Sequence, residues 1–347
     1  MIMISDLTEL TIIIPTRDRP KYLHRALSYY DSFGLNLKII VADSSLGTNK
    51  DKNIAAVKQF KKLQILLLND FAYETPPYLK CLDALKKVKT NYSIFGADDD
   101  FHSVKGLAYA LSYLKSNLDY VAVEGENVFV SKIKSFFFWK PGDVFLSLED
   151  SNVLSRMKNH SLYYQPTFYT ICKTNFFIYL FNQAANTNSL EYPFGEFQPS
   201  FLTVIKGKVK RLNVIYSYRD HTDDFHWDDP PTNLIQKYKD DGTFRERYLQ
   251  FKNVLVKELS NGAGISERSA DKFIDKCLLR FFKKQETTKP IKLMKKVLGH
   301  SFLYYLCVKI YLYIKWLRMD LKRYWKLRIL LRNNPEFKKV KYFIMRP

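Results

Sequence analysis

The sequence has little cysteine, glycine or proline, and it lacks a long uninterrupted apolar run. Its four cysteines lie far apart and form no CxxC pair, which argues against a zinc knuckle or a disulfide framework. With 12 glycines and 13 prolines in 347 residues, low-complexity linkers are not expected. No run reaches the roughly 18 to 20 apolar residues that cross a bilayer, and Asp6 and Glu9 interrupt the stretch where a signal peptide needs its apolar core. We expect a folded chain with reduced cysteines that is neither secreted by this route nor transmembrane.

Positive charge and aromatic side chains are what the sequence has in excess. There are 55 basic and 35 acidic residues, a net charge of +20, and the aromatic content is 16%. The last 61 residues hold 16 of the basic residues and only two acids, so most of the excess charge lies there. A hydrophobic content of 46% is enough for a substantial core.

Apolar, β-branched runs alternate with helical patterns along the first 100 residues. Such alternation predicts a parallel α/β sheet with right-handed crossovers. The expected strands are "LTIIIPT", "LKIIVADSS", "LQILLLN" and "NYSIFG", and the expected helices between them are "RPKYLHRALSYYDSFG", "NKDKNIAAVKQFKK" and "PYLKCLDALKKVKT".

The second half of the chain begins irregular and aromatic and then returns to order. We expect a helix from about Gln198, a turn at Gly207 and a strand from Val209 to Tyr218. A loop rich in Pro and Asp marks the end of the α/β domain near residue 243. The predicted division is a domain over 1–243 with halves 8–125 and 126–243, a helical extension over 244–286, and a basic tail over 287–347.

Three consecutive carboxylates, Asp98, Asp99 and Asp100, follow the fourth expected strand. Like charges side by side repel, and oxygen-rich clusters suit Mg²⁺ or Mn²⁺ carried together with a phosphate. Asp43 ends a neighbouring strand, and the carboxyl ends of strands are where open α/β sheets bind ligands. The alternatives are a solvated turn that caps the next helix and, for Asp43, an Asx turn.

"TIIIPTRDRPKYLHRAL", "IIVADSS" and "NYSIFGADDDF", in this order, resemble the nucleotide-binding half of GT-A fold glycosyltransferases similar to family 2, in particular a bacterial subgroup acting in surface-polysaccharide assembly. The resemblance covers residues 8–125 well and 190–221 more loosely. It implies a Rossmann-like mixed sheet that is mostly parallel. In this chain we expect a helical, basic C-terminal extension to follow the sheet. It also implies Mn²⁺ or Mg²⁺, a nucleotide-diphosphate sugar donor, a glycan or lipid-linked acceptor, and inversion at the anomeric carbon.

The resemblance also assigns donor contacts residue by residue. The metal would lie on Asp100, with Asp98 and His221 as further ligands, although His221 is alternatively a hydrogen-bonded loop residue and Arg17 a solvated strand-end charge. The residues assigned to the nucleotide are Pro15, Thr16, Arg17, Asp43, Asp98, Asp99 and Arg219.

The resemblance further implies a catalytic base at the start of a helix that runs to a glycine and then a strand, and Glu196 has that location. The family more often shows a Glu-Asp pair, whereas Phe197 follows here, so Glu191 is the reserve candidate. The aromatic surroundings "YPFGEF" should raise the pKa of Glu196 and favour proton uptake. The alternative is an acid that stabilises a helix N-terminus. His226 and Trp227 are expected as lid residues.

Residues 302–332 combine apolar and aromatic residues with a basic stripe. Such a segment can lie on an anionic membrane surface, which suits a cytoplasmic enzyme peripheral to the inner face of a bacterial membrane. The alternatives are a helix packed on the domain and, less favoured because no recognised motif accompanies the charge, nucleic-acid binding. Rival functions are a nucleotidyltransferase, which would normally carry a glycine-rich loop absent from "PTRDRP", and a non-catalytic sugar- or membrane-binding scaffold.

Overall fold

The computed structural model describes residues 4–133, 135–142, 145–187, 189–220, 234–285, 297–298 and 323–346. Within these residues the strands are β1 (Leu10–Thr16), β2 (Lys38–Asp43), β3 (Gln64–Leu68), β4 (Tyr92–Phe95), β5 (Phe101–His102), β6 (Tyr120–Ile133), β7 (Phe136–Pro141), β8 (Ile171–Lys173) and β9 (Lys208–Asp220). The helices are α1 (Pro20–Asp31), α2 (Gly47–Gln59), α3 (Pro77–Leu85), α4 (Val104–Ser116), α5 (Val153–Leu162), α6 (Thr174–Asn186), α7 (Phe194–Lys206), α8 (Leu234–Asp240), α9 (Gly242–Ala263), α10 (Glu267–Gln285) and α13 (Pro335–Met345). A 3-10 helix (Ile4–Glu9) precedes β1, and residues 323–332 are also helical.

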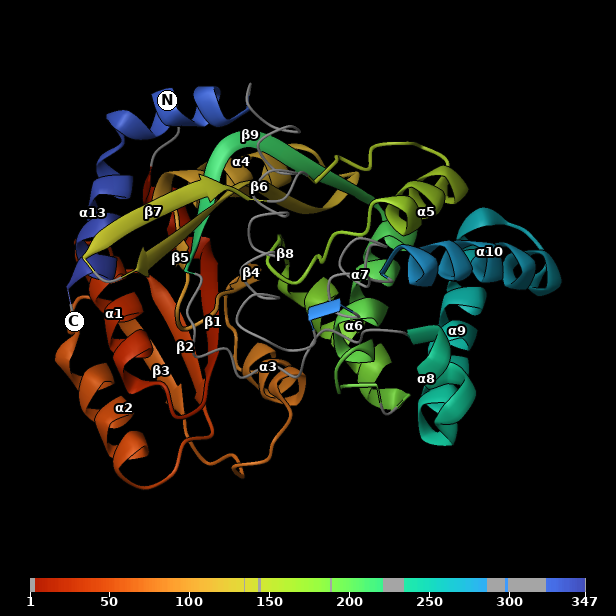
Figure 1. The fold of residues 1–347 in the computed structure, drawn as a ribbon, viewed down its shortest axis with the longest axis horizontal. Helices are drawn as coiled ribbons and strands as arrows, with labels where there is room; N and C mark the ends of the chain where they lie inside the picture. The colour runs from red at the N-terminus through yellow and green to blue at the C-terminus, as the bar shows by residue number, and fades with distance from the viewer. Residues whose placement is uncertain are drawn as a thin grey trace.

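One mixed sheet organises the described chain, in the order β3-β2-β1-β4-β8-β6-β9-β5, with β7 added to β6 (Figure 1). Strands β1, β2, β3, β4, β6 and β9 run in one direction, and β5, β7 and β8 run in the other. The expected α/β architecture with a mixed, mostly parallel sheet is therefore confirmed. The predicted domain boundaries stay predictions.

Helices cover both faces of the sheet because the parallel strands are apolar on both sides. In β1, Ile12 and Ile14 face a core shared with α1, α4 and α13, whereas Ile13 faces a core shared with α3, α6, α7 and α9. This burial on both faces explains why the strand reads as a continuous β-branched run. In Figure 1, α13 lies beside α1 at one end of the molecule and α8, α9 and α10 lie at the other.

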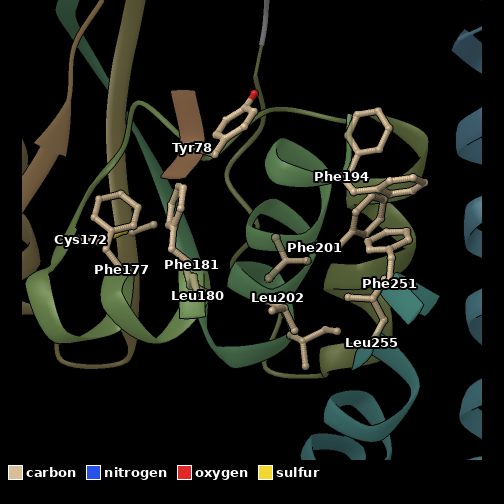
Figure 2. Close-up of a cluster of buried hydrophobic side chains, with 14 of the residues drawn as sticks. Tyr78, Cys172, Phe177, Leu180, Phe181, Phe194, Phe201, Leu202, Phe251 and Leu255 are labelled. Carbon is tan, nitrogen blue, oxygen red and sulfur yellow. The ribbon is translucent and has the colours of Figure 1, made fainter. Parts of the chain in front are cut away.

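An aromatic core holds α7, and it corrects the expected start of that helix. Phe194, Phe201 and Phe251 pack between α7 and α9, and Phe177 and Phe181 from α6 continue the cluster towards the sheet (Figure 2). The helix begins at Phe194 and not near Gln198, because the side chains of its first turn already belong to this core and helical spacing brings them together. Glu196 therefore lies in the first turn of α7.

The end of the described chain packs on the sheet and on α4. Trp139 of β7 stacks on Tyr324, with ring centroids 5.0 Å apart and planes 7° from parallel. Glu336 of α13 binds the N-terminal end of α4. One carboxylate oxygen accepts a hydrogen bond from the hydroxyl of Ser103, and the other accepts one from the backbone N–H of Lys105 at 3.0 Å. Residues 302–322 lie outside the described part, and none of the described helices is long and apolar enough to span a bilayer.

The substitution Gly106→Ala tests the close approach of α4 to β9. A Cβ at this position would lie 2.3 Å from the backbone O of Ile215, so Gly106→Ala should lower the free energy of unfolding by about 2 kcal/mol. The matched control is Gly262→Ala in α9, where the nearest atom is 3.8 Å away, and this variant should be about 0.5 kcal/mol more stable than the parent. Urea denaturation measures both. Equal stability of the Gly106 variant and the parent would contradict this packing.

Candidate active site

The carboxyl ends of β1, β2 and β4 meet at one edge of the sheet. The parallel register places Thr16 opposite Asp43, and β4 lies on the other side of β1. The hydroxyl of Thr16 donates a hydrogen bond to Oδ2 of Asp98 at 2.7 Å. The structure thus brings three of the predicted site residues to the location where α/β sheets bind their ligands.

Arginine guanidinium groups neutralise the carboxylates. Arg19, which precedes α1, contacts Oδ1 of Asp98 at 2.6 Å and Oδ2 of Asp99 at 2.7 Å. Arg25 contacts Oδ2 of Asp220 at 2.7 Å and donates to the backbone O of Asp99 at 3.1 Å. Paired guanidinium contacts of this kind are among the stronger charge-assisted hydrogen bonds. The acids therefore form a buried charge cluster, and the N-cap of α4 is Ser103 and not one of them.

Asp98, Asp99 and Asp100 are buried, and burial shifts the pKa of Asp98 and of Asp100. It raises the pKa of Asp98 to about 7 although the charge of Arg19 opposes the shift. Burial, followed by the charge of Asp99, raises the pKa of Asp100 well above its usual value, while Arg219 opposes this shift. Desolvation disfavours the charged form, so an added cation would stabilise both groups as carboxylates.

Asp43 has its carboxylate bound by its own neighbours. Oδ1 accepts hydrogen bonds from the backbone N–H and the hydroxyl of Ser45 at 2.8 and 2.5 Å, and Oδ2 accepts one from Asn53 at 2.9 Å. The first contact is the Asx turn that the sequence left open as an alternative. Contact of Asp43 with a base or ribose stays a prediction.

Lys80 of α3 ties the ends of β1 and β2 together below the acids. Its ammonium donates to the backbone O of Thr16 at 2.8 Å and to the hydroxyl of Ser44 at 2.9 Å. Burial lowers the pKa of Lys80 to about 8, and the charges of Asp43 and Asp98 oppose this shift. Lys80, which is only 3% exposed, thus joins the ends of two strands at the site.

Arg17 and Pro15 border the same edge. The guanidinium of Arg17 lies 5.0 Å from the ring centre of Tyr73 and donates to the backbone O of that residue at 3.3 Å. Asp18 has a φ of 56°, an uncommon conformation for a residue with a side chain, and its N–H donates to the hydroxyl of Ser45 at 2.7 Å. The loop after β1 is thus held to the loop after β2.

Tyr169 connects the acid cluster to the predicted base. The guanidinium of Arg219 lies over its ring, 4.5 Å from the centre. Burial raises the pKa of Tyr169, and the charges of Asp100, Asp99 and Glu196 raise it further. A single phenol therefore lies within electrostatic reach of the metal-binding candidates and of the base candidate.

Glu196 is buried more deeply than Glu191. Its Oε1 accepts a hydrogen bond from the hydroxyl of Tyr164 at 2.9 Å, and burial raises its pKa while Tyr164 and Arg219 oppose the shift. Gly195 lets this turn of α7 pack closely on Tyr78, because a Cβ at that position would lie 2.4 Å from the ring of Tyr78. The side chain of Glu191 is 54% exposed and pairs with Arg247, which makes it the weaker candidate.

A divalent cation that arrives with phosphate groups fits this edge. Among the described residues no three His, Cys, Asp or Glu side chains are grouped to hold a metal ion. Such a cation needs only one or two protein carboxylates when phosphates supply other ligands. Oδ1 of Asp100 accepts the N–H of Asp220 at 3.0 Å, and Oδ2 has no hydrogen-bond partner in the described part of the chain. His221, His226 and Trp227 lie outside the described residues.

Sequence reasoning missed Arg19, Lys80 and Tyr169. Arg19 was visible in "PTRDRP", and its pairing with two acids was foreseeable from the need to neutralise them. The roles of Lys80 and Tyr169 depend on contacts between residues far apart in the chain, 64 positions in the case of Lys80 and Thr16. Local patterns carry no signal for such contacts.

No family model and no curated protein sequence matches the chain. Similar solved structures include TarS 1-349 from S. aureus in complex with UDP-GlcNAc, at 17% identity over 79% of this chain and 72% of that chain, with a TM-score of 0.49. A longer S. aureus TarS structure has 15% identity and a TM-score of 0.47, and the same 79% of this chain spans only 43% of its length. The mannosyltransferase PcManGT from Pyrobaculum calidifontis, in complex with GDP-Man and Mn²⁺, has 9% identity over 97% of this chain and 85% of that chain, with a TM-score of 0.42. These identities and TM-scores are low, so we base the function on the residues of the site.

Arg19→Ala tests the neutralising role of this guanidinium. The variant leaves Asp98 and Asp99 buried without their main counter-charge, and the free energy of unfolding at pH 8 should fall by about 2 kcal/mol. The matched control is Lys86→Ala, which removes an exposed pair with Asp83 and should change stability by less than about 0.5 kcal/mol. Urea denaturation of both variants is the measurement. A loss no larger than that of the control would show that Arg19 is not the main counter-ion.

Proposed function

We propose that this protein is a glycosyltransferase that moves a sugar from a nucleotide-diphosphate donor to a glycan or lipid-linked acceptor. One observation supports the proposal most: acids and arginines converge at the carboxyl edge of a parallel sheet, near a half-buried glutamate with a raised pKa. Asp98, Asp99 and Asp100 provide the acids, and Glu196 is the base. The sequence resemblance to GT-A glycosyltransferases supports the same function.

The donor would bind across the ends of β1, β2 and β4. The loop at Pro15, Thr16 and Arg17 would border the nucleotide, and Asp43 would contact the base or ribose. The diphosphate would lie near Asp100 and Arg219, where a positive guanidinium is already present. A divalent cation held there by Asp100 and the donor phosphates, with Asp98 and His221 as further candidates, would neutralise the departing diphosphate.

The proposed reaction is a single displacement with inversion. Glu196 takes the proton of the acceptor hydroxyl as its oxygen bonds to the anomeric carbon, and the bond from that carbon to the diphosphate breaks. The nucleoside diphosphate leaves with the bonding electrons, and Arg219 stabilises its charge. Burial suits Glu196 to this task because it raises the pKa and makes the carboxylate a better proton acceptor.

The proposed setting is bacterial surface-polysaccharide assembly at the inner face of the cell membrane. The positive charge of the last 61 residues supports an attachment to anionic lipid through residues 302–332, of which 323–332 are described. A lipid-linked acceptor would be reached from this position.

The rival functions make different use of the same edge. A nucleotidyltransferase normally has a glycine-rich loop after its first strand, and residues 15–20 contain no glycine. A non-catalytic scaffold would bind a nucleotide without turnover even when acceptors are present. The half-buried base candidate in α7, with its raised pKa, favours a transferase over both.

Nucleotide titration tests the donor site. Calorimetry with UDP, GDP, CDP and TDP, with and without Mn²⁺, should show metal-dependent binding of one nucleotide, which Asp100→Ala should weaken at least about tenfold. The control is Asp70→Ala, an exposed acid after β3, which should bind like the parent. Absence of binding for all four nucleotides would refute the donor site.

Glu196→Gln tests the base. The variant should bind the nucleotide like the parent but lose about 10²- to 10⁴-fold in the rate of glycosyl transfer, because the amide cannot accept the proton. In the parent, the rate should fall as pH drops through the raised pKa of Glu196, since only the carboxylate is active. Glu191→Gln is the control. A full rate in the Glu196 variant, with loss in the control, would move the role to Glu191.

A further inference from the structure

The hairpin of β6 and β7 exposes large apolar side chains. Along β7 the residues alternate: Phe137 and Trp139 face the protein, whereas Phe136, Phe138 and Lys140 face solvent. Phe136 is 66% exposed and Phe138 is 48% exposed, and their ring centroids lie 6.4 Å apart. Exposed apolar side chains that adjoin one another usually mark a binding surface.

Cations surround this hairpin. The sequence from Phe129 to Gly142 contains three lysines and no acid, and Lys132 and Lys140 are exposed. The ammonium of Lys132 donates to the backbone O of Met345 at 3.0 Å, and that of Lys341 lies 5.8 Å from the ring centre of Phe137. The end of α13 therefore adds its own positive charge at the hairpin.

The hairpin is fixed in place from behind. Besides the stacking of Trp139 on Tyr324, the guanidinium of Arg323 donates to the backbone O of Gly142 at 2.8 Å. The helical segment 323–332 continues the combination of apolar and basic side chains, with Trp325 54% and Ile329 73% exposed. The apolar side chains of β7 are thus presented on a rigid support.

The outer face of the hairpin is the same sheet face that carries the proposed phosphate contact. Arg219 of β9 lies opposite Phe129 of β6, and Phe129 lies opposite Lys140 of β7. Partners across neighbouring strands point to the same side of a sheet, and the ammonium of Lys140 lies 5.2 Å from the ring centre of Phe129. The side chains of Phe136 and Phe138 therefore lie on the same side of the sheet as Arg219.

We propose that the β6–β7 hairpin, with Phe136, Phe138 and Lys140, is a docking surface for an anionic lipid bilayer. Phenylalanine rings can enter the boundary between headgroups and acyl chains while Lys140 on the same face contacts the anionic headgroups. The absence of acids from residues 129–142 complements such a surface, and phenylalanine offers no hydrogen bond to a glycan. This inference rests on the membrane association proposed above and extends it from the tail to the catalytic domain, whose acceptor side then faces the headgroups.

Vesicle co-sedimentation of the full chain tests the inference. The parent should bind vesicles of phosphatidylcholine with phosphatidylglycerol and should bind pure phosphatidylcholine weakly. The double variant Phe136→Ser with Phe138→Ser should lose at least about tenfold in partitioning to the anionic vesicles. Its control is Leu118→Ser, which removes an apolar side chain that is 78% exposed at another surface.

A second pair of variants tests the charge. Lys140→Glu should lower partitioning about fivefold or more, whereas Lys52→Glu, an exposed lysine of α2, should have a smaller effect. Thermal melting shows whether each variant is folded. If the folded double variant binds vesicles like the parent, or if the parent binds none, the inference is wrong. A dimer in light scattering that dissociates on Phe136→Ser with Phe138→Ser would instead assign this face to a second copy, pairing along the edge of β7.

Nucleotide titration on the same samples separates this inference from the proposed function. Nucleotide binding without vesicle binding would leave the donor site in place and remove the docking surface. Vesicle binding that depends on Phe136 and Phe138, without binding of any nucleotide, would remove the transferase and leave the docking surface.

Discussion

The ion pairs of Arg19 with two neighbouring aspartates are the interaction on which the rest of the site depends. Burying consecutive carboxylates costs desolvation free energy, and the carboxylates also repel one another. Only a nearby cation offsets these costs. Arg19 provides that cation from the start of α1, and Arg25 provides a second, one turn and a half along the same helix, for Asp220. The acids at the strand ends therefore need α1 in this position, because it places Arg19 and Arg25 beside them.

This arrangement sets conditions on any ligand. Four carboxylates, from Asp98, Asp99, Asp100 and Asp220, lie among the guanidinium groups of Arg19, Arg25 and Arg219. A phosphate group competes with the acids for the arginines, and a divalent cation competes with the arginines for the acids. A ligand that brings both charges would give the acids a cation and the arginines an anion, so that no buried charge is left alone. This is the physical reason to propose a metal-bound diphosphate and not either ion by itself.

The sequence predicts the sheet well and the charge pairing poorly, for physical reasons. Strands β1, β2 and β4 are buried on both faces, so their β-branched runs are unambiguous, and the acids after β4 follow from the end of that run. Lys80 and Tyr169 act through contacts that exist only after the chain has folded, and no local pattern distinguishes them from other residues of α3 or of the segment before β8. The start of α7 was misplaced because the packing of Phe194, and not a capping residue, decides it.

The contact of Glu336 with Ser103 has a consequence for synthesis. The two residues are 233 positions apart, yet the carboxylate of one completes the N-terminal turn of the helix that directly follows the acid cluster. During translation α4 leaves the ribosome before α13 is made. Until then the N–H of Lys105 lacks the carboxylate of Glu336, and part of the core that α4 and α13 both line is uncovered.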